Sequence, residues 1–122
     1  MYELIVQAWF SAAHRLREYH GDCEKLHGHN WKIDVRLRSD RLDSLGMVCD
    51  FRRLRRLLQD VVDRLDHQYL NDVPPFTGIN PTTENIARFV FDELAKTLPA
   101  ELSASSVTAW ESEDCGATYH GQ

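Results

Sequence analysis

Two segments of this 122-residue chain alternate between apolar and polar residues, and this pattern limits the fold more than any other feature. Residues 2–12 carry an apolar side chain at every second position, and residues 30–38 repeat the pattern more cleanly. The apolar positions are Leu4, Val6, Ala8, Phe10, Trp31, Ile33, Val35 and Leu37. A period of two is typical of a strand that buries one face. We therefore expect two half-buried strands in the first third of the chain.

Two helices are expected in the middle of the chain. Asp50 has the side chain of an N-cap, and the residues after it place apolar side chains at three- and four-residue steps as far as Leu65. This spacing is typical of an amphipathic helix. After a proline-containing loop, a second helix is expected to start at Thr82 or Thr83 and to stop at Pro99.

Two short strands are expected to close the chain. They span residues 105–112 and 117–120, and the sequence E-D-C-G forms the turn between them. The predicted order is therefore ββααββ, within a single domain that covers residues 1–122. This order favours an α+β fold in which a four-stranded antiparallel sheet is covered on one face by two helices.

Charge and hydropathy exclude several classes of protein. The formal net charge is −5, which argues against a general nucleic-acid binder. Four arginines within residues 52–56 lie on the first predicted helix, and we interpret them as a solvated face. No apolar run is long enough to cross a bilayer, and the N-terminus lacks the pattern of a signal peptide. These features predict a cytoplasmic protein that does not bind membranes.

The three cysteines are Cys23, Cys49 and Cys115. An odd number in a cytoplasmic protein argues against a disulfide framework. The chain has no C-x-x-C pair and no fourth cysteine, which excludes an all-cysteine zinc site within one chain. Cys49 and Cys115 belong to no catalytic motif, and we interpret them as packing or incidental residues.

Three histidines are expected to converge at one end of the first two strands. His27 and His29 continue the apolar parity of the second strand, and His14 continues that of the first if no bulge intervenes. Three imidazoles with an open fourth position are typical of a catalytic zinc site. Cys23 is the alternative fourth ligand, which would close the site into a structural one, and the spacing alone leaves both readings open.

A carboxylate and an imidazole stand side by side at Asp66 and His67, directly after the first helix. Such a pair can fix the tautomer of the imidazole and serve in acid–base chemistry. A polar helix end is the simpler interpretation of these two residues alone. His20 and His120 are expected to be surface residues.

The combined motifs resemble the 6-pyruvoyltetrahydropterin synthase family over nearly the whole chain. They are F-S-A-A-H-R-L at 10–16, C-E-K-L-H-G-H at 23–29, L-D-H-Q-Y-L-N at 65–71, N-P-T-T-E-N at 80–85 and W-E at 110–111. The three residues between the cysteine and H-G-H look most like the bacterial 6-carboxytetrahydropterin synthase branch. The resemblance implies the tunnelling fold, with trimers stacked as a homo-hexamer and active sites between subunits.

The resemblance also implies a role for each motif residue. It assigns zinc to His14, His27 and His29, the general base to Cys23, the second acid–base group to Asp66 and His67, the pterin anchor to Glu111, and part of the pterin pocket to Thr82, Thr83 and Glu84. A carboxylate suits the anchor because it accepts two parallel hydrogen bonds.

The implied substrate is 7,8-dihydroneopterin triphosphate, and the implied products are 6-carboxy-5,6,7,8-tetrahydropterin, acetaldehyde and triphosphate. Because the chain is acidic, local cations must hold the triphosphate, and Arg15, Arg17 and Lys25 are the candidates. A pyruvoyl-forming synthase or a side-chain-cleaving relative is the first alternative. A non-catalytic domain stabilised by zinc is the second.

Overall fold

The computed structural model describes residues 1–21 and 24–121, and its elements follow the predicted order. They are β1 (Tyr2–His14), β2 (His27–Ser39), α1 (Phe51–Val62), the 3-10 helix η1 (Leu70–Asp72), α2 (Thr83–Ala95), β3 (Ser103–Trp110) and β4 (Gly116–Tyr119). The sequence did not predict η1. The first two strands are longer than expected, because both continue as far as the histidines.

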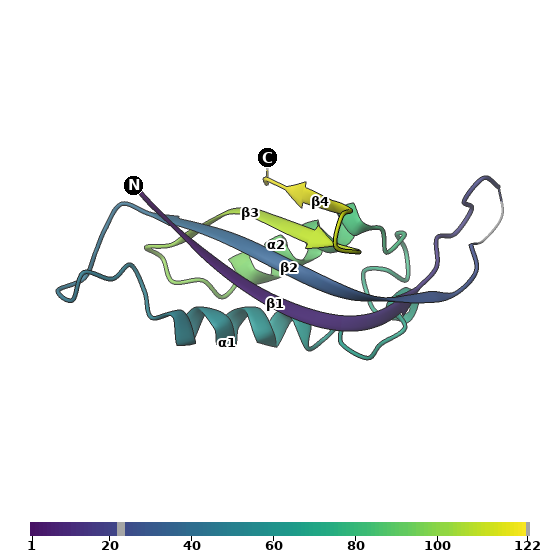
Figure 1. Cartoon of the computed structure of the whole chain (residues 1–122), viewed down its shortest axis with the longest axis horizontal. Coiled ribbons are helices and arrows are strands. Elements are labelled where there is room, and N and C mark those ends of the chain that lie inside the picture. The colour runs from purple at the N-terminus through teal and green to yellow at the C-terminus, as the bar shows by residue number, and fades with distance from the viewer. Residues whose placement is uncertain (22–23, 122) are drawn as a thin grey trace.

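The four strands form one antiparallel sheet in the order β1-β2-β3-β4. Figure 1 shows α1 and α2 on the same side of this sheet, with the long, curved β1 and β2 running past both helices. The predicted α+β architecture is therefore confirmed. No described helix is long and apolar enough to cross a membrane.

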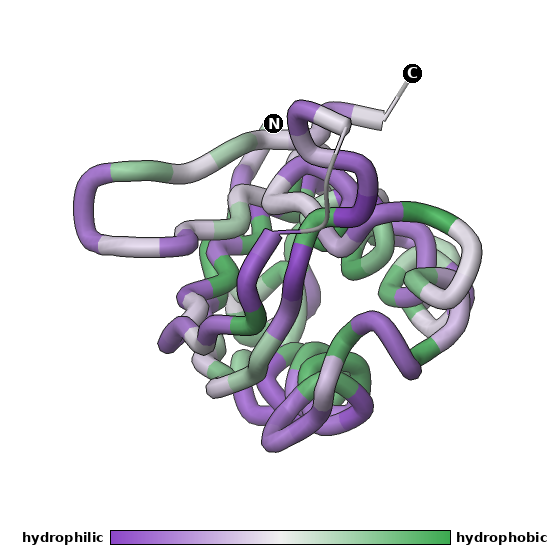
Figure 2. The backbone as a smooth tube through the Cα atoms, turned by 90° about the vertical axis from the view of Figure 1, so that its right-hand side faces the viewer, coloured by the Kyte–Doolittle hydropathy of each residue, from purple (hydrophilic) through white to green (hydrophobic). Residues whose placement is uncertain are grey.

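The register of β1 against β2 explains the alternation in the sequence. Val6 pairs with Val35, Phe10 pairs with Trp31, and the pairing continues without a break to the strand ends. Since side chains on a strand alternate between faces, every second residue enters the core. Figure 2, which looks along the long axis of the molecule, shows hydrophobic and hydrophilic residues interspersed along the backbone.

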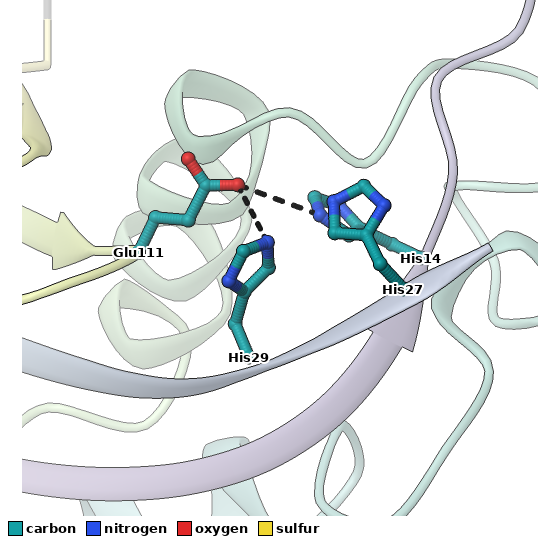
Figure 3. Close-up of side chains that lie close together, drawn as sticks. All are labelled: His14, His27, His29 and Glu111. Carbon is teal, nitrogen blue, oxygen red and sulfur yellow. Dashed lines mark ion pairs between the residues drawn. The ribbon is translucent and has the colours of Figure 1, made fainter. Parts of the chain in front are cut away.

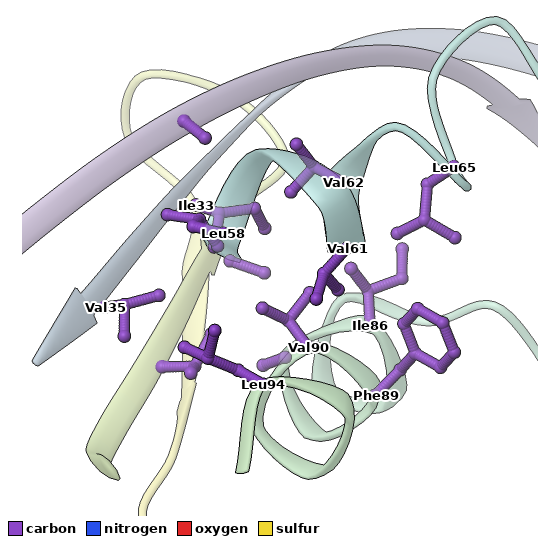
Figure 4. Packing of buried hydrophobic residues seen from close by; sticks show 14 of the residues in the cluster. Ile33, Val35, Leu58, Val61, Val62, Leu65, Ile86, Phe89, Val90 and Leu94 are labelled. Carbon is purple, nitrogen blue, oxygen red and sulfur yellow. The ribbon is translucent and has the colours of Figure 1, made fainter. Parts of the chain in front are cut away.

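The core lies between the sheet and the two helices. Ile33 and Val35 from β2 face Leu58 of α1 and Val90 of α2, and all four side chains are fully buried (Figure 4). Burying a side chain of this size stabilises the fold by about 1.5–3 kcal/mol relative to its exposure. The helices are therefore held mainly by their apolar stripes.

Side-chain caps fix where each helix begins. The Asp50 carboxylate accepts the Arg52 N–H at the start of α1, as predicted. The hydroxyl of Thr82 accepts the Asn85 N–H at 3.1 Å, so α2 begins at Thr83 with Thr82 as its cap.

Leu58→Ala tests the importance of the helix–sheet contact. Leu58 is fully buried, so its truncation should lower the free energy of unfolding by about 2–5 kcal/mol. Leu45→Ala is the control, because Leu45 is 79% exposed and the same truncation should change stability by less than about 0.5 kcal/mol. Denaturant unfolding at one fixed protein concentration measures both variants, and equal losses would contradict this description of the core.

Candidate functional site

The pairing of β1 with β2 brings the three predicted histidines together. His14 is the last residue of β1 and pairs directly with His27, the first residue of β2. His29 follows two residues later on the same face of the sheet. The ring centroids lie 4.7 Å apart for His14 and His27, 4.8 Å for His27 and His29, and 5.2 Å for His14 and His29.

Backbone carbonyl groups orient two of these rings. The Pro81 carbonyl lies 2.8 Å from Nδ1 of His14, and the Lys25 carbonyl lies 2.8 Å from Nδ1 of His27. A carbonyl can only accept, so each Nδ1 carries the hydrogen and each Nε2 offers a lone pair. This is the arrangement in which histidine binds metals.

Glu111 completes the cluster, as Figure 3 shows. Its Oε1 lies 2.9 Å from Nε2 of His29 and 3.5 Å from Nε2 of His14. One ligand atom from each of the four residues lies within 4.8 Å of the others. The sequence assigned Glu111 to the pterin and did not predict its contact with the imidazoles.

The position of Glu111 follows from strand register. Trp110 pairs with Lys32, so Glu111 comes level with Trp31 and diagonally opposite His29. The turn after β3 holds this position, because the Glu111 N–H donates to the Cys115 carbonyl at 2.9 Å. The pairing of β3 with β2 is therefore the signal that would have revealed the contact.

The cluster has the chemical features of a divalent-metal site. Nε2 of His14 and Nε2 of His29 are buried, and neither makes a hydrogen bond within the described residues, although the Glu111 carboxylate lies close to both. Burial lowers the pKa of His29; the Glu111 carboxylate opposes this effect, and His14 and His27 add to it. A neutral imidazole with an unpaired Nε2 is the form that binds zinc, so these residues fit the predicted metal.

The predicted base, Cys23, lies outside the described residues. The next described residue is Glu24, whose N–H donates to the Leu16 carbonyl at 2.8 Å. The carboxylate of Glu24 accepts the Leu16 N–H at 3.3 Å and lies 3.6 Å from Nδ1 of His27. Glu24 thus fastens the start of β2 to the segment that follows β1.

Asp66 and His67 lie apart from the histidine cluster, on the outer edge of β1. The His67 N–H donates to the Ser11 carbonyl at 2.6 Å, and Oδ1 of Asp66 accepts the Ser11 N–H at 2.9 Å. That hydrogen bond is the main reason why the pKa of Asp66 lies below its usual value. Oδ2 of Asp66 lies 2.9 Å from Nδ1 of His67, which leaves Nε2 of this exposed ring available.

The three residues predicted to line the pterin pocket stand at the start of α2. Thr82 is the helix cap, Thr83 is half-buried and Glu84 is exposed in the first turn. The hydroxyl of Thr82 is therefore already engaged as the cap of α2, at the position where the sequence predicted that the helix begins. The Pro81 carbonyl just before them holds His14, so this segment adjoins the histidine cluster.

The three candidate cations differ in their surroundings. Arg17 donates to three backbone carbonyl groups, those of Phe76, Asn71 and Ile79, at 2.7, 3.1 and 3.2 Å. Its guanidinium is therefore already engaged, and the structure gives no support for its role with triphosphate. Arg15 and Lys25 are both exposed.

The two described cysteines are both free thiols. Cys49 is half-buried and packs against the core, in agreement with the predicted packing role. Cys115 is exposed in the turn between β3 and β4, where its carbonyl rather than its thiol holds Glu111.

His14→Ala tests the histidine cluster. His14 is buried and oriented by a carbonyl, so its removal should weaken Zn²⁺ binding by at least about 100-fold. His120→Ala is the matched control, since His120 is exposed and stands outside the cluster. Competition with a chromophoric chelator gives both affinities, and equal affinities for the two variants would rule out His14 as a ligand.

Comparison with known proteins identifies the family. The family profile described as 6-pyruvoyl tetrahydropterin synthase matches residues 3–122. The chain is 34% identical to dihydroneopterin monophosphate aldolase from Pyrococcus furiosus, over 93% of this chain and 92% of that protein. It is 43% identical to 6-carboxy-5,6,7,8-tetrahydropterin synthase from Synechocystis, over 70% of this chain and 68% of that protein.

The fold agrees with this relationship. The structure of 6-pyruvoyl tetrahydropterin synthase from Caenorhabditis elegans superposes with a TM-score of 0.84 and 27% identity, and the match covers 99% of this chain and 96% of that one. Profile, sequence identity and fold all agree, and the chain belongs to the 6-pyruvoyl tetrahydropterin synthase family of enzymes.

Proposed function

We propose that this chain is a zinc-dependent carbon–carbon lyase of the 6-carboxytetrahydropterin synthase type. Its substrate would be 7,8-dihydroneopterin triphosphate, and its products 6-carboxy-5,6,7,8-tetrahydropterin, acetaldehyde and triphosphate, early in the synthesis of queuosine and other 7-deazapurines. The observation that carries the proposal is the group of three imidazoles that meet at one strand junction, two of which, His14 and His29, have a buried Nε2 without a hydrogen bond in the described residues. The 43% identical relative from Synechocystis supports the choice of reaction.

His14, His27 and His29 would hold the zinc ion through their Nε2 atoms. When bound, zinc supplies a Lewis acid that polarises the side-chain oxygens of the substrate. The protein fixes these ligands in advance, because the carbonyl groups of Pro81 and Lys25 already orient two of the rings.

Glu111 would anchor the pterin ring. Its carboxylate is one-third exposed, beside the histidines, and can accept two parallel hydrogen bonds from the amino and ring N–H groups of a pterin. Thr83 and Glu84 would line the same pocket from the start of α2, together with Thr82. The hydroxyl of Thr82 can donate to a ligand while its oxygen caps the helix.

Cys23 would act as the general base. It stands four residues before His27, and a nearby cation stabilises a thiolate near neutral pH. The thiolate would take a proton from the side chain of the substrate. A base in this role must be free of the metal, which separates the proposal from a closed structural zinc site.

His67 would exchange a proton on the other side of the substrate. Asp66 holds Nδ1 of His67, so Nε2 is the atom that would donate or accept. Because His67 is 82% exposed on the outer edge of β1, a substrate bound at a neighbouring subunit can reach it. Each site would then combine the histidines of one subunit with the Asp66–His67 pair of another.

The assembly would be a homo-hexamer formed by two stacked trimers. The N–H groups of Ser11 and Ala13 point away from β2, so those of Ile5, Gln7 and Trp9 do the same. In the described part of the chain, these three outward groups have no backbone partner. A groove of about 500 Å³ beside them is lined by the exposed side chains of Ile5, Trp9 and Phe51. An open edge with an apolar border is suited to a strand from a second copy.

Two other functions remain as alternatives on the same scaffold. A pyruvoyl-forming synthase or a side-chain-cleaving aldolase would use the same metal and pterin anchor, and relatives with both names resemble this chain. A non-catalytic zinc domain would instead use Cys23 as a ligand and unfold on chelation.

A mass-resolved product assay with 7,8-dihydroneopterin triphosphate tests the reaction. The wild type should release acetaldehyde and 6-carboxytetrahydropterin. Cys23→Ala should keep its zinc and fold but lose activity by at least about 100-fold, since the general base is gone. A product without acetaldehyde would favour the pyruvoyl-forming alternative, and loss of zinc from Cys23→Ala would make Cys23 a ligand.

Glu111→Gln serves as the second variant in this assay. It keeps the shape of the side chain but removes the charge that matches the pterin N–H groups. We expect normal zinc content and a raised KM. A loss of zinc without any change in KM for the remaining loaded enzyme would make Glu111 a ligand rather than an anchor.

Ile5→Pro tests the assembly through the open edge of β1. Proline removes the outward N–H of residue 5 and leaves the ladder with β2 intact, as an edge strand permits. We expect a smaller particle than the wild type in size-exclusion chromatography with light scattering, whereas Ile5→Ala keeps the N–H and the wild-type mass. An unchanged mass for Ile5→Pro would exclude pairing at this edge.

A further inference from the structure

The outer edge of β1 stays paired beyond the point where the strand ends. Ser11 bonds to Asp66 and His67, and the Ala13 N–H donates to the Gln68 carbonyl at 3.0 Å. The next two residues whose backbone groups point away from β2, Arg15 and Arg17, lie past His14, and no strand of the described residues pairs with them. Their backbone groups are nevertheless paired, each by the side-chain amide of an asparagine.

Asn71 provides the first of these amides. Its Oδ1 accepts the Arg15 N–H at 3.0 Å, and its Nδ2 donates to the Arg15 carbonyl at 2.9 Å. One side chain therefore makes both hydrogen bonds that a neighbouring strand would make. Only 5% of the surface of Asn71 is exposed, so these hydrogen bonds also satisfy a buried amide.

Asn80 makes the same pair of hydrogen bonds with Arg17, two residues after Arg15. Its Oδ1 accepts the Arg17 N–H at 2.8 Å, and its Nδ2 donates to the Arg17 carbonyl at 3.0 Å. The Asn80 carbonyl in turn accepts Nδ2 of Asn85 at 2.9 Å, in the first turn of α2. The second amide is thus fixed to a helix.

Arg17 connects the two amides. Its guanidinium donates to the carbonyl groups of Asn71, Phe76 and Ile79. These hydrogen bonds hold the 71–80 segment against the backbone of residues 15–17. We call Asn71, Asn80 and Arg17 the amide bracket.

The amide bracket acts next to a predicted metal ligand. His14 lies between Ala13, whose N–H is bound by Gln68, and Arg15, which Asn71 holds on both sides. The ring of His14 is held by Pro81, directly after Asn80. Backbone and ring are therefore both fixed by residues 68–81, and the direction of Nε2 depends on that segment.

We propose that Asn71 is a positioning residue for the metal centre, with Asn80 and Arg17 in support. It fixes the backbone that follows His14, and so sets the direction of Nε2 of His14 toward His27 and His29. The inference rests on the metal site of the proposed function but not on the reaction catalysed there. If the positioning is correct, loss of Asn71 lowers metal affinity by more than the accompanying loss of folding stability can explain.

Binding of Co²⁺ to the full-length protein, stripped of metal, tests this inference. The d–d absorption of Co²⁺ reports its coordination geometry, and chelator competition reports its affinity. Asn71→Ala should weaken Co²⁺ binding by about 10–100-fold, the usual cost of losing a group that orients a ligand. Its absorption bands should also shift and weaken, because Nε2 of His14 is no longer held in place.

Asn71→Asp is the conservative second variant, and it decides the question if Asn71→Ala does not fold. It keeps the oxygen that accepts the Arg15 N–H but replaces the donor that faces the Arg15 carbonyl. We expect an affinity between those of the wild type and Asn71→Ala. Asn80 holds Arg17, which lies two residues further from His14 than Arg15 does. Asn80→Ala should therefore lower Co²⁺ affinity less than Asn71→Ala does.

Two controls separate positioning from general effects. Asn30→Ala makes the same change beside another histidine. Among the described residues the Asn30 amide accepts a hydrogen bond from the Ser11 hydroxyl, at 2.6 Å, and holds no backbone next to a histidine ligand, so this variant should leave Co²⁺ affinity within about twofold. Leu54→Ala removes a buried side chain from the first turns of α1 and destabilises the fold without touching the site. Its Co²⁺ spectrum should match the wild type.

The outcomes separate this inference from the proposed function. Folded Asn71 variants with wild-type affinity and spectrum would overturn the positioning role while leaving the metal site in place. An equal loss in Leu54→Ala would also overturn it, because binding would then follow stability alone. Failure of the wild type itself to bind Co²⁺ would overturn the metal site and this inference together.

Discussion

The pairing of β1 with β2 is the interaction on which the rest of the structure depends. It places Phe10 beside Trp31 and Val6 beside Val35, which forms the buried face that the two helices cover. The same unbroken register places His14 opposite His27 at the strand ends. A shift by one residue would turn every apolar side chain to the other face. The core and the candidate metal site are therefore fixed by one set of hydrogen bonds.

The site depends on polar groups that come from segments outside the sheet. Carbonyl groups of Pro81 and Lys25 orient two imidazoles, and Asn71 replaces a missing strand beside Arg15. Segments outside the sheet are free to place such groups, because no strand ladder uses their backbone hydrogen bonds. The 68–81 segment therefore does more than connect α1 to α2, because its residues hold the backbone and the ring of His14 in place.

The division of charge around the site is consistent with the proposed chemistry. Glu111 faces the imidazoles from the end of β3, whereas Asp66 and His67 face outward from the edge of β1. One group of side chains is thus assembled within the subunit, and the other is presented to its surroundings. This separation gives a physical reason for an active site shared between subunits in the proposed assembly.

Period and spacing in the sequence determined much of this protein. The alternation in residues 2–12 and 30–38 predicted both long strands, their buried faces and the convergence of His14, His27 and His29. The Asp50 cap and the apolar stripes predicted both helices, since these signals are local. The separate motifs indicated the family only in combination.

Only the tertiary structure decided the contacts between distant segments. The approach of Glu111 to His29 depends on how β3 aligns with β2, and the bond from Asn71 to Arg15 joins residues far apart in the sequence. The engagement of Arg17 by three carbonyl groups likewise could not be seen in a basic residue near a motif. Sequence patterns report which face of its own element a side chain occupies. The partner that meets that face is set by the packing of the whole chain.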